Sequence, residues 1–430
     1  GMLVTADRVF GGHLYVRNGK IAAISDDGTL PAREELDAAG LYVLPGMLDC
    51  HAHINDPGFT WREDLPHASE AAAVGGVTTL IDMPLQNTPP LTSADAFANK
   101  LAVFEGRSLV DYALWGGLVT DNTAELAGMD AAGAVGFKAF IAPVSLGYSS
   151  VDMGLAREAL FRIKAFGGLA GFHCEDHALI CAGEAKAKAG GGTRRAFLDS
   201  RPVVAEVIAT ANVIELARET GARVHICHVS HPRVAELVRR AQADGLSVTG
   251  ETCPHYLVFT EENLLLCGTV FKCAPPLRTA EARDGLWEYV LDGTLSCIGS
   301  DHSPSRPDEK DEAVHGVMGA WGGLSGLQSF VQVMFDQAVT RRGCSPSLLA
   351  RFASSAARVF GLDADAVLID PGRAWTITAH SLRYLNPFSA FEGLEGVGLP
   401  VCTVVRGRVV AREGNVLAPF GHGLFQPRKP

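Results

Sequence analysis

The sequence predicts an α/β fold, namely a TIM (β/α)8 barrel with a small β-sandwich domain built from both termini. From about residue 43 to residue 300, strand-like and helix-like segments alternate eight times, which is the pattern of a barrel of parallel strands. Before and after this region the chain reads as short strands with tight turns, such as Asn18-Gly19 and Arg406-Gly407. A doubly wound open sheet is the alternative, but no Gly-rich phosphate loop accompanies the strands.

The spacing of apolar residues along the sequence predicts where strands and helices lie. Strands are short apolar runs, the first of them bounded by Gly40 and Pro45-Gly46. We expect barrel strands at 41–48, 77–83, 111–118, 134–141, 170–174, 223–229, 247–252 and 295–300. We expect helices, which are longer and have apolar residues three and four positions apart, near 65–75, 93–105, 152–166, 203–220, 232–244, 280–291, 324–341 and 346–359.

Shorter strands at both ends are expected to form the second domain. Residues 14–16 and 21–24 flank the Asn18-Gly19 turn, and further short strands are expected at 366–369, 375–378, 401–405 and 407–410. The predicted domains are therefore 1–44 with 362–430 for the β-sandwich and 45–361 for the barrel.

Composition narrows the function classes. The chain has 430 residues, of which 47% are hydrophobic and 20% charged, as in a globular protein. A net charge of −11 without a basic stripe argues against a nucleic-acid partner, and no apolar run has the ~18 residues of a membrane span. The ten cysteines include no CxxC pair, and the six in strand-like segments (Cys50, Cys174, Cys227, Cys253, Cys273 and Cys297) are expected to be buried free thiols. A disulfide framework is not expected, so we expect a cytoplasmic protein.

Residues that can ligate a metal ion lie at the ends of the expected strands. The first strand leads into His51 and His53, which project to the same face because side chains two apart in a strand do so. A hydrogen-bonded histidine pair would be the alternative. Other strand ends carry further candidates, and the carboxyl ends of barrel strands are where chemistry occurs. These candidates are Lys138, His173, His228, Glu251 and Asp301.

Lys138 is unusual because it lies among apolar residues of an inner strand, where an ammonium group is costly to bury. A structural ion pair with a barrel carboxylate is one explanation. The other is that a neutral amine at this position takes up carbon dioxide. The resulting carbamate has two oxygens and could bridge two metal ions.

Seven motifs distributed along the chain carry a family resemblance. They are Pro45-Gly46-Met47-Leu48-Asp49-Cys50-His51-Ala52-His53, Gly75-Gly76-Val77-Thr78-Thr79, Gly136-Phe137-Lys138, Glu251-Thr252-Cys253-Pro254-His255-Tyr256, Lys272-Cys273-Ala274-Pro275-Pro276-Leu277-Arg278, Ser300-Asp301-His302-Ser303-Pro304 and Ala320-Trp321-Gly322-Gly323-Leu324. With these motifs the chain resembles the cyclic amidohydrolases of the amidohydrolase superfamily, and most closely the allantoinases.

The resemblance implies two divalent metal ions per chain, usually zinc. His51, His53 and Asp301 would hold the first ion, His173 and His228 the second, and carboxylated Lys138 would bridge both. His225 and His228 would point to opposite faces of the sixth strand, so alternation along the strand does not decide which of them is the ligand. The family motif favours His228. Glu175 shares the parity of His173 and is a weaker alternative ligand. Asp301 would also serve as the catalytic acid and base.

The resemblance also implies a small cyclic amide as substrate. Asn55 and backbone groups near Ala274 and Gly322 would contact it, and the enzyme would be a homotetramer or a homodimer. Dihydroorotases have an arginine where this chain has Asn55, and an amide does not replace a bidentate arginine–carboxylate contact. Dihydropyrimidinases and many hydantoinases place a tyrosine soon after the lysine, whereas the first tyrosine here is Tyr148.

The main hypothesis is therefore hydrolysis of allantoin to allantoate by a binuclear metal centre. A hydantoinase or dihydropyrimidinase-like enzyme is the alternative, and a dihydroorotase is less favoured. Some relatives with the same barrel have lost the metal ligands and act as assembly or signalling proteins. That hypothesis predicts missing ligands, whereas all six positions carry competent residues here.

Overall fold

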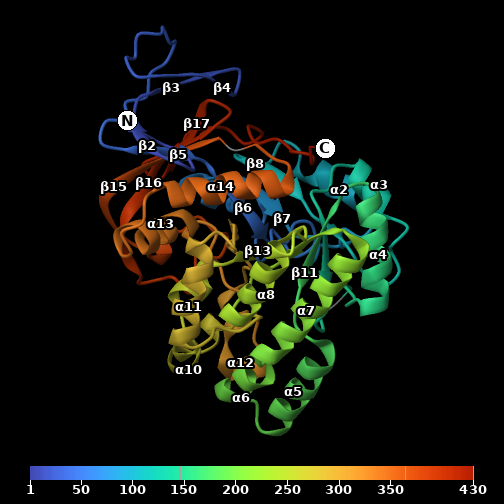
Figure 1. Ribbon diagram of the computed structural model, residues 1–430. Helices are drawn as coiled ribbons and strands as arrows, with labels where there is room; N and C mark the ends of the chain where they lie inside the picture. The colour runs from blue at the N-terminus through green and yellow to red at the C-terminus, as the bar shows by residue number, and fades with distance from the viewer. Residues whose placement is uncertain (145–146, 364, 430) are drawn as a thin grey trace.

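The predicted fold class is confirmed by a computed structural model that describes residues 1–144, 147–363 and 365–429. Parallel strands wind around the barrel in chain order (Figure 1). They are β6 (Met47–Ala52), β7 (Val77–Asp82), β8 (Asp111–Leu114) with its continuation β9 (Gly116–Gly117), β10 (Phe137–Phe140), β11 (Leu169–His173), β12 (Arg223–Ile226), β13 (Val248–Thr252) and β14 (Cys297–Ile298). A parallel bridge between Ala52 and His302 connects the end of the last strand back to the first.

Helices surround the barrel on its outer side (Figure 1). Those near the predicted positions are α1 (Leu65–Gly75), α2 (Ala94–Phe104), α4 (Met153–Ala165), α7 (Val203–Thr220), α8 (Pro232–Ala243), α11 (Ala280–Leu291) and α14 (Ser347–Phe360). Further helices, all but α5 shorter, lie in the connections: α3 (Leu126–Ala131), α5 (His177–Ala189), α6 (Arg194–Ser200), α9 (Pro254–Val258), α10 (Glu261–Cys267), α12 (Glu312–Gly319) and α13 (Phe330–Phe335). None of the described helices is long and apolar enough to cross a membrane.

Local chemistry explains where α1 begins and ends. The side chain of Asp64 accepts a hydrogen bond from the backbone N–H of His67, and proline occupies the first turn. Gly76 ends the helix with φ of 87°, a conformation that glycine adopts without a steric penalty. Strand β7 begins at the next residue, so the helix places the second barrel strand beside the first.

The helix predicted at 324–341 is wrong in its first part. Leu324 forms a parallel bridge with His302, and the backbone N–H of Ser303 donates to the carbonyl of Leu324 at 2.8 Å. Regular α-helix begins only at Phe330. Leu324 pairs with the segment that follows β14, and residues 327–329 form a turn that leads into the helix. The helical apolar spacing in this stretch gave no sign of that pairing.

Both termini contribute to one seven-stranded sheet, in the order β18-β17-β16-β15-β5-β1-β2. Its strands are β1 (Met2–Val4), β2 (Val9–Gly11), β5 (Tyr42–Pro45), β15 (Ala366–Thr376), β16 (Glu395–Val405), β17 (Arg408–Arg412) and β18 (Asn415–Val416). β5 pairs in parallel with β1 and antiparallel with β15, so the N-terminal and C-terminal segments join there. The exact domain boundaries at 44/45 and 361/362 stay a prediction.

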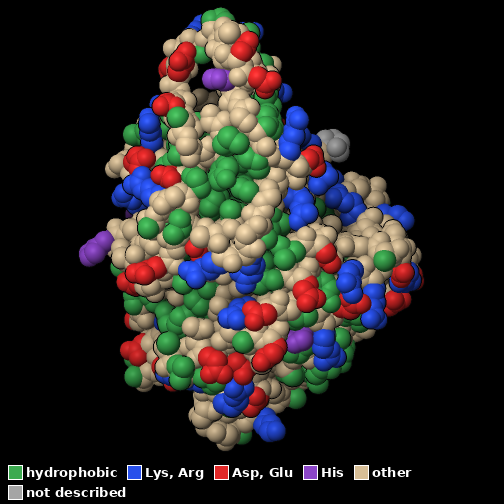
Figure 2. All heavy atoms as spheres, turned by 60° about the vertical axis from the view of Figure 1, so that its left-hand side comes forward, with side chains coloured by type: hydrophobic (Ala, Val, Ile, Leu, Met, Phe, Trp, Pro, Cys, Tyr) green, Lys and Arg blue, Asp and Glu red, His purple; other side chains and the backbone are tan. Residues whose placement is uncertain are grey.

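The expected hairpin at Asn18-Gly19 is β3 (His13–Arg17) with β4 (Lys20–Ser25). It projects from the second domain in Figure 1. A Cβ atom built on Gly19 would lie 3.0 Å from Cβ of Arg406, so the two predicted turns are neighbours. In the view of Figure 2, apolar side chains gather on the upper half of the molecule, and acidic and basic side chains are intermixed on the lower half.

The last residues of the chain run along the barrel. Leu424 accepts a hydrogen bond from the backbone N–H of Tyr112 at 3.0 Å, and the backbone N–H of Gln426 donates to the Tyr112 carbonyl at 2.8 Å. Tyr112 also forms a parallel bridge with Phe425. The C-terminal tail therefore adds a strand-like segment beside β8.

Trp115 fills the barrel interior. Its side chain is fully buried, and its indole N–H donates to the carbonyl of Cys50 at 3.2 Å. A Cβ atom on Gly136 or Gly171 would lie 2.6 Å or 2.8 Å from this ring. Glycine is therefore required on β11 and immediately before β10, where the indole packs against their backbones.

Candidate functional site

The three residues predicted to hold the first metal lie together at the junction of β6 and β14. Nε2 of His51 and Nε2 of His53 each lie 3.4 Å from Oδ1 of Asp301. Their candidate ligand atoms all fall within 4.8 Å of one another, and all three residues are buried. Two imidazoles and a carboxylate at this spacing are a suitable donor set for one divalent ion.

Glu251, at the end of β13, holds the ring of His51 from behind. Its carboxylate hydrogen-bonds Nδ1 of His51, accepts from the Cys50 thiol at 2.9 Å and from the His228 backbone N–H at 3.3 Å, and contacts Nε2 of His225 at 3.2 Å. Burial opposes its ionisation, but His51 and His225 hold the pKa of Glu251 well below its ordinary value. A fixed carboxylate on Nδ1 directs Nε2 of His51 toward Asp301.

The rings of His173 and His228 continue the cluster. Their centroids lie 4.6 Å apart, and that of His228 lies 5.2 Å from that of His51. Phe140 stacks on His173 with centroids 4.9 Å apart. His225, the alternative left open by strand parity, instead bonds Glu251. The predicted second pair is thus adjacent to the predicted first set.

Lys138 is fully buried in β10, and its amine has no hydrogen-bond partner among the described residues. It lies 5.1 Å from the centroid of the Phe140 ring. Burial, and after it the nearby Lys138 amine, lowers the pKa of His51 and His228. Tyr148, the first tyrosine after Lys138 in the chain, uses its hydroxyl to donate a hydrogen bond to the Lys138 carbonyl at 2.5 Å.

Three residues of the cluster region have strained backbones. Asn55, His228 and Asp301 have φ angles of 60°, 38° and 46°. Left-handed conformations cost non-glycine residues about 1–3 kcal/mol and concentrate at functional sites. Strain at the ends of the first, sixth and eighth barrel strands therefore supports a functional role for this region.

The three predicted substrate contacts come from three separate segments of the chain. Asn55 is fully buried, and its amide nitrogen donates to the carbonyl of His53 at 3.1 Å. Gly322 is exposed and lies in the 320–324 segment that leads to the bridge with His302. Ala274 precedes Pro275, whose carbonyl accepts a hydrogen bond from Tyr256 at 2.6 Å. Their roles toward a substrate stay predictions.

Sequence reasoning missed the ion pair behind His173. Oε2 of Glu175 lies 2.7 Å from Nε2 of His173 and accepts from Nη1 of Arg201 at 2.5 Å. Glu184 holds the other end of the guanidinium at 2.8 Å. Glu175, weighed as an alternative ligand, thus bonds a histidine and an arginine. Its spacing from His173 was a usable signal, whereas nothing local indicated Arg201.

A second missed contact joins the loops after β6 and β14. The Arg62 guanidinium lies 3.8 Å over the ring of Trp321, and its Nε donates to Glu309 at 2.8 Å. The Trp321 indole N–H donates to the carbonyl of Ser303 at 3.2 Å. These contacts connect the loop that follows His53 with the loop that follows Asp301.

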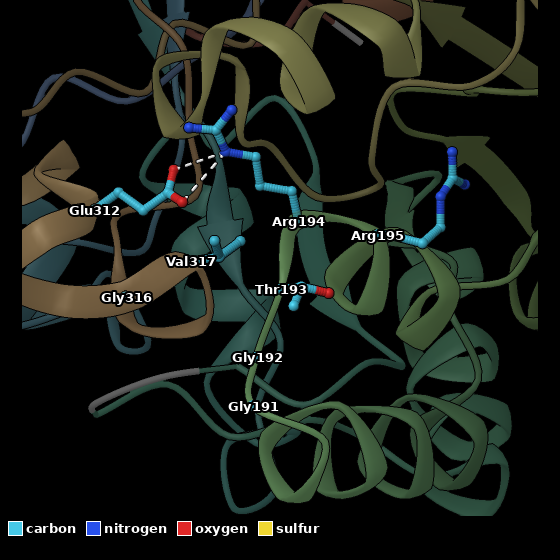
Figure 3. Close-up of a pocket in the computed structure, with 8 residues that line it drawn as sticks. All are labelled: Gly191, Gly192, Thr193, Arg194, Arg195, Glu312, Gly316 and Val317. Atoms are coloured by element: carbon cyan, nitrogen blue, oxygen red, sulfur yellow. Dashed lines mark hydrogen bonds and ion pairs between the residues drawn. The ribbon is translucent and has the colours of Figure 1, made fainter.

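A cavity of about 500 Å³ lies elsewhere, between the α5–α6 connection and α12 (Figure 3). Its lining is Gly191, Gly192, Thr193, Arg194, Arg195, Glu312, Gly316 and Val317. Arg194 points toward Glu312, with Nε 2.9 Å from a carboxylate oxygen, while Arg195 points away. Because none of these residues is a predicted ligand and its acid is paired, this cavity is distinct from the histidine cluster.

Comparison with known proteins identifies relatives along almost the whole chain. Allantoinase from Rubrobacter xylanophilus is 39% identical over 427 residues, covering 96% of this chain and 94% of the relative. Allantoinase from Escherichia coli strain K12 is 38% identical over 434 residues with the same coverage.

Solved structures agree with this relationship. L-hydantoinase (dihydropyrimidinase) from Arthrobacter aurescens superposes with a TM-score of 0.96 at 36% identity, covering 99% of this chain and 98% of the other. Dihydropyrimidinase from Brevibacillus agri NCHU1002 gives 0.93 at 26% identity, covering 100% and 97%. The Amidohydrolase family profile matches residues 42–410. With its buried histidine–carboxylate cluster at the carboxyl ends of the barrel strands, the chain belongs to the amidohydrolase family.

Proposed function

We propose that this protein hydrolyses a cyclic amide, with allantoin as substrate and allantoate as product. One observation carries the reaction class. A buried group of His51, His53 and Asp301 adjoins a second histidine pair and a lysine amine without a hydrogen-bond partner among the described residues. Such a donor set suits a two-metal hydrolase, and the family relationship supports the same reaction class.

The residues fit two divalent ions. We propose that His51, His53 and Asp301 hold one ion, that His173 and His228 hold the other, and that carboxylated Lys138 contacts both. The fit rests on Lys138, because a buried amine without a hydrogen-bond partner is costly. As a carbamate, it would place negative charge among the donors. Zinc is the proposed metal, since nitrogen-rich sets of this kind suit it.

The protein side chains then have defined tasks. Bound divalent ions supply Lewis acidity, which favours ionisation of water and polarisation of a carbonyl. A carboxylate oxygen of Asp301 accepts the proton of the attacking water and delivers it to the departing ring nitrogen. Glu251 holds the ring of His51 in place during this exchange. Asn55 keeps the turn after His53 closed through its hydrogen bond to the His53 carbonyl.

The choice of allantoin rests on the curated relatives, which are named allantoinase at 38–39% identity over nearly the whole chain. Asn55 in place of an arginine disfavours a substrate with a carboxylate at that point. A hydantoin or dihydropyrimidine substrate is the second candidate, since L-hydantoinase is 36% identical with a TM-score of 0.96.

A substrate comparison tests the proposal. Purified protein loaded with zinc should open allantoin faster than 5-substituted hydantoins or dihydrouracil, and Lys138→Ala should lose both activity and bound metal. Brisk hydantoin turnover without allantoin turnover would reverse the order of the two candidates. Protein that retains less than one ion per chain and opens none of these rings would refute the reaction class.

Assembly and location are further proposals. We propose a homotetramer or a homodimer, which light scattering of the purified chain would measure. All ten cysteines are free thiols, as expected of a protein from a reducing compartment. The cytoplasm is therefore the proposed location.

A further inference from the structure

His255 is a buried histidine whose ring has no hydrogen-bond partner in the described part of the chain. Only 1% of its surface is exposed, and both Nδ1 and Nε2 lack a partner among the described residues. An imidazole in either tautomer offers one donor and one acceptor, so both functions are unused. Buried polar groups in native proteins are normally paired, and an unpaired one lowers stability. A ligand that completes these bonds would explain why the histidine is there.

The ring faces the predicted catalytic carboxylate. Candidate ligand atoms of His255, Asp301 and Cys253 all lie within 4.8 Å of one another. This separation does not include a direct bond, since both ring nitrogens lack a partner among the described residues. It is short enough for one polar atom placed between the imidazole and Asp301 to reach both at hydrogen-bond distance. A reacting amide would occupy that position.

The helix that carries His255 is firmly held. Helix α9 begins with Pro254 directly after β13, and the ring of Tyr256 packs on His255 with centroids 4.2 Å apart. The Tyr256 hydroxyl donates to the carbonyl of Pro275 at 2.6 Å. His255 is thereby fixed between the catalytic cluster and the loop that carries Ala274, a predicted substrate contact.

We propose that His255 is a substrate-binding residue that hydrogen-bonds the amide being cleaved and holds it against Asp301. The inference rests on the proposed function for the reaction class, but not on allantoin itself. No bond to His255 forms or breaks. Its imidazole pairs with the ring N–H or carbonyl of the substrate, so that the departing nitrogen faces the proton on Asp301.

The test compares His255→Leu with His255→Gln, using whichever cyclic amide the wild-type protein hydrolyses. His255→Leu should lower kcat/KM by roughly 10- to 100-fold, because the substrate loses a hydrogen-bond partner in a buried site. Metal content should stay at the wild-type value. The melting temperature should stay equal or rise, since the leucine removes unpaired polar atoms. His255→Gln, which keeps a donor and an acceptor, should recover most of the activity.

Ser347→Ala is the matched control. It also removes a buried polar atom without a partner among the described residues, but it lies in α14, so its kinetic constants should not change. A His255→Leu variant within twofold of wild type in kcat and KM would overturn the inference. So would loss of metal or a clear fall in melting temperature, because either indicates a structural role. Wild-type protein that opens no cyclic amide would instead refute the proposed function.

Discussion

Replacing Arg201 by methionine should destabilise the protein far more than replacing an exposed arginine. Arg201 is 8% exposed and its Nη1 bonds Glu175, which is fully buried and also bonds His173. Methionine has similar length and no charge, so the variant leaves the Glu175 carboxylate buried without its cation. The same loss should free the ring of His173 to turn and should weaken metal binding at the second proposed position.

The magnitude follows from the pair itself. Burial opposes the charge on Glu175, but Arg201, followed by His173, lowers its pKa from 4.5 to about 2. A shift of that size corresponds to roughly 3 kcal/mol at neutral pH. Removing one partner of a buried ion pair independently suggests ~3–5 kcal/mol. For 430 residues unfolding at ~2.1 cal/mol/K per residue, the melting temperature should fall by about 3–6 °C.

Calorimetry of metal-free protein and metal analysis after dialysis measure the two effects. Arg194→Met is the matched control, since its pair with Glu312 is about one-third exposed and should contribute under ~1 kcal/mol. Adding Glu175→Gln to Arg201→Met should restore part of the stability, because the buried carboxylate that lost its cation is then removed. An Arg201→Met variant as stable as Arg194→Met, or a double variant no better than the single one, would refute this reasoning.

Three further predictions concern other parts of the fold. Burial raises the pKa of Glu206 to about 7 against 4.5 for an ordinary side chain, so the folded protein holds more protons between these values and loses stability as pH rises through them. Glu206→Gln should remove that slope in melting temperatures recorded from pH 4.5 to 7. Gly423→Ala would place Cβ 1.9 Å from the Val110 carbonyl and should cost ~1–3 kcal/mol, whereas Gly11→Ala meets nothing within 4 Å and should cost almost nothing in the same melting assay. Glu251→Gln should weaken metal binding at least ~10-fold in a chelator titration because His51 loses its carboxylate partner, and unchanged affinity would contradict that role.

Residues whose signal is local were predictable. Lys138 stood out because it interrupts an apolar strand, and the spacing of His51 and His53 indicated a common face. Helix α1 was expected near 65–75 and is observed at Leu65–Gly75, with its capping residues Asp64 and Gly76 adjoining it in the chain.

Contacts between distant segments were not predictable in the same way. Arg201 follows α6 and bonds Glu175, which lies 26 positions earlier in the chain, and no residue near Arg201 indicates this contact. Likewise, Leu324 is extended because it pairs with His302, although the surrounding apolar spacing favours a helix. Pairing across the fold outweighed local preference there.

The bridge between Ala52 and His302 has a consequence for biosynthesis. His51 and His53 leave the ribosome early, whereas Asp301 is translated only after the last barrel strand. An ion that arrived sooner would find two imidazoles and no carboxylate at the first position. Under the proposed function, the first metal position is therefore complete only after Asp301 has been translated, when 129 of the 430 residues are still to be added.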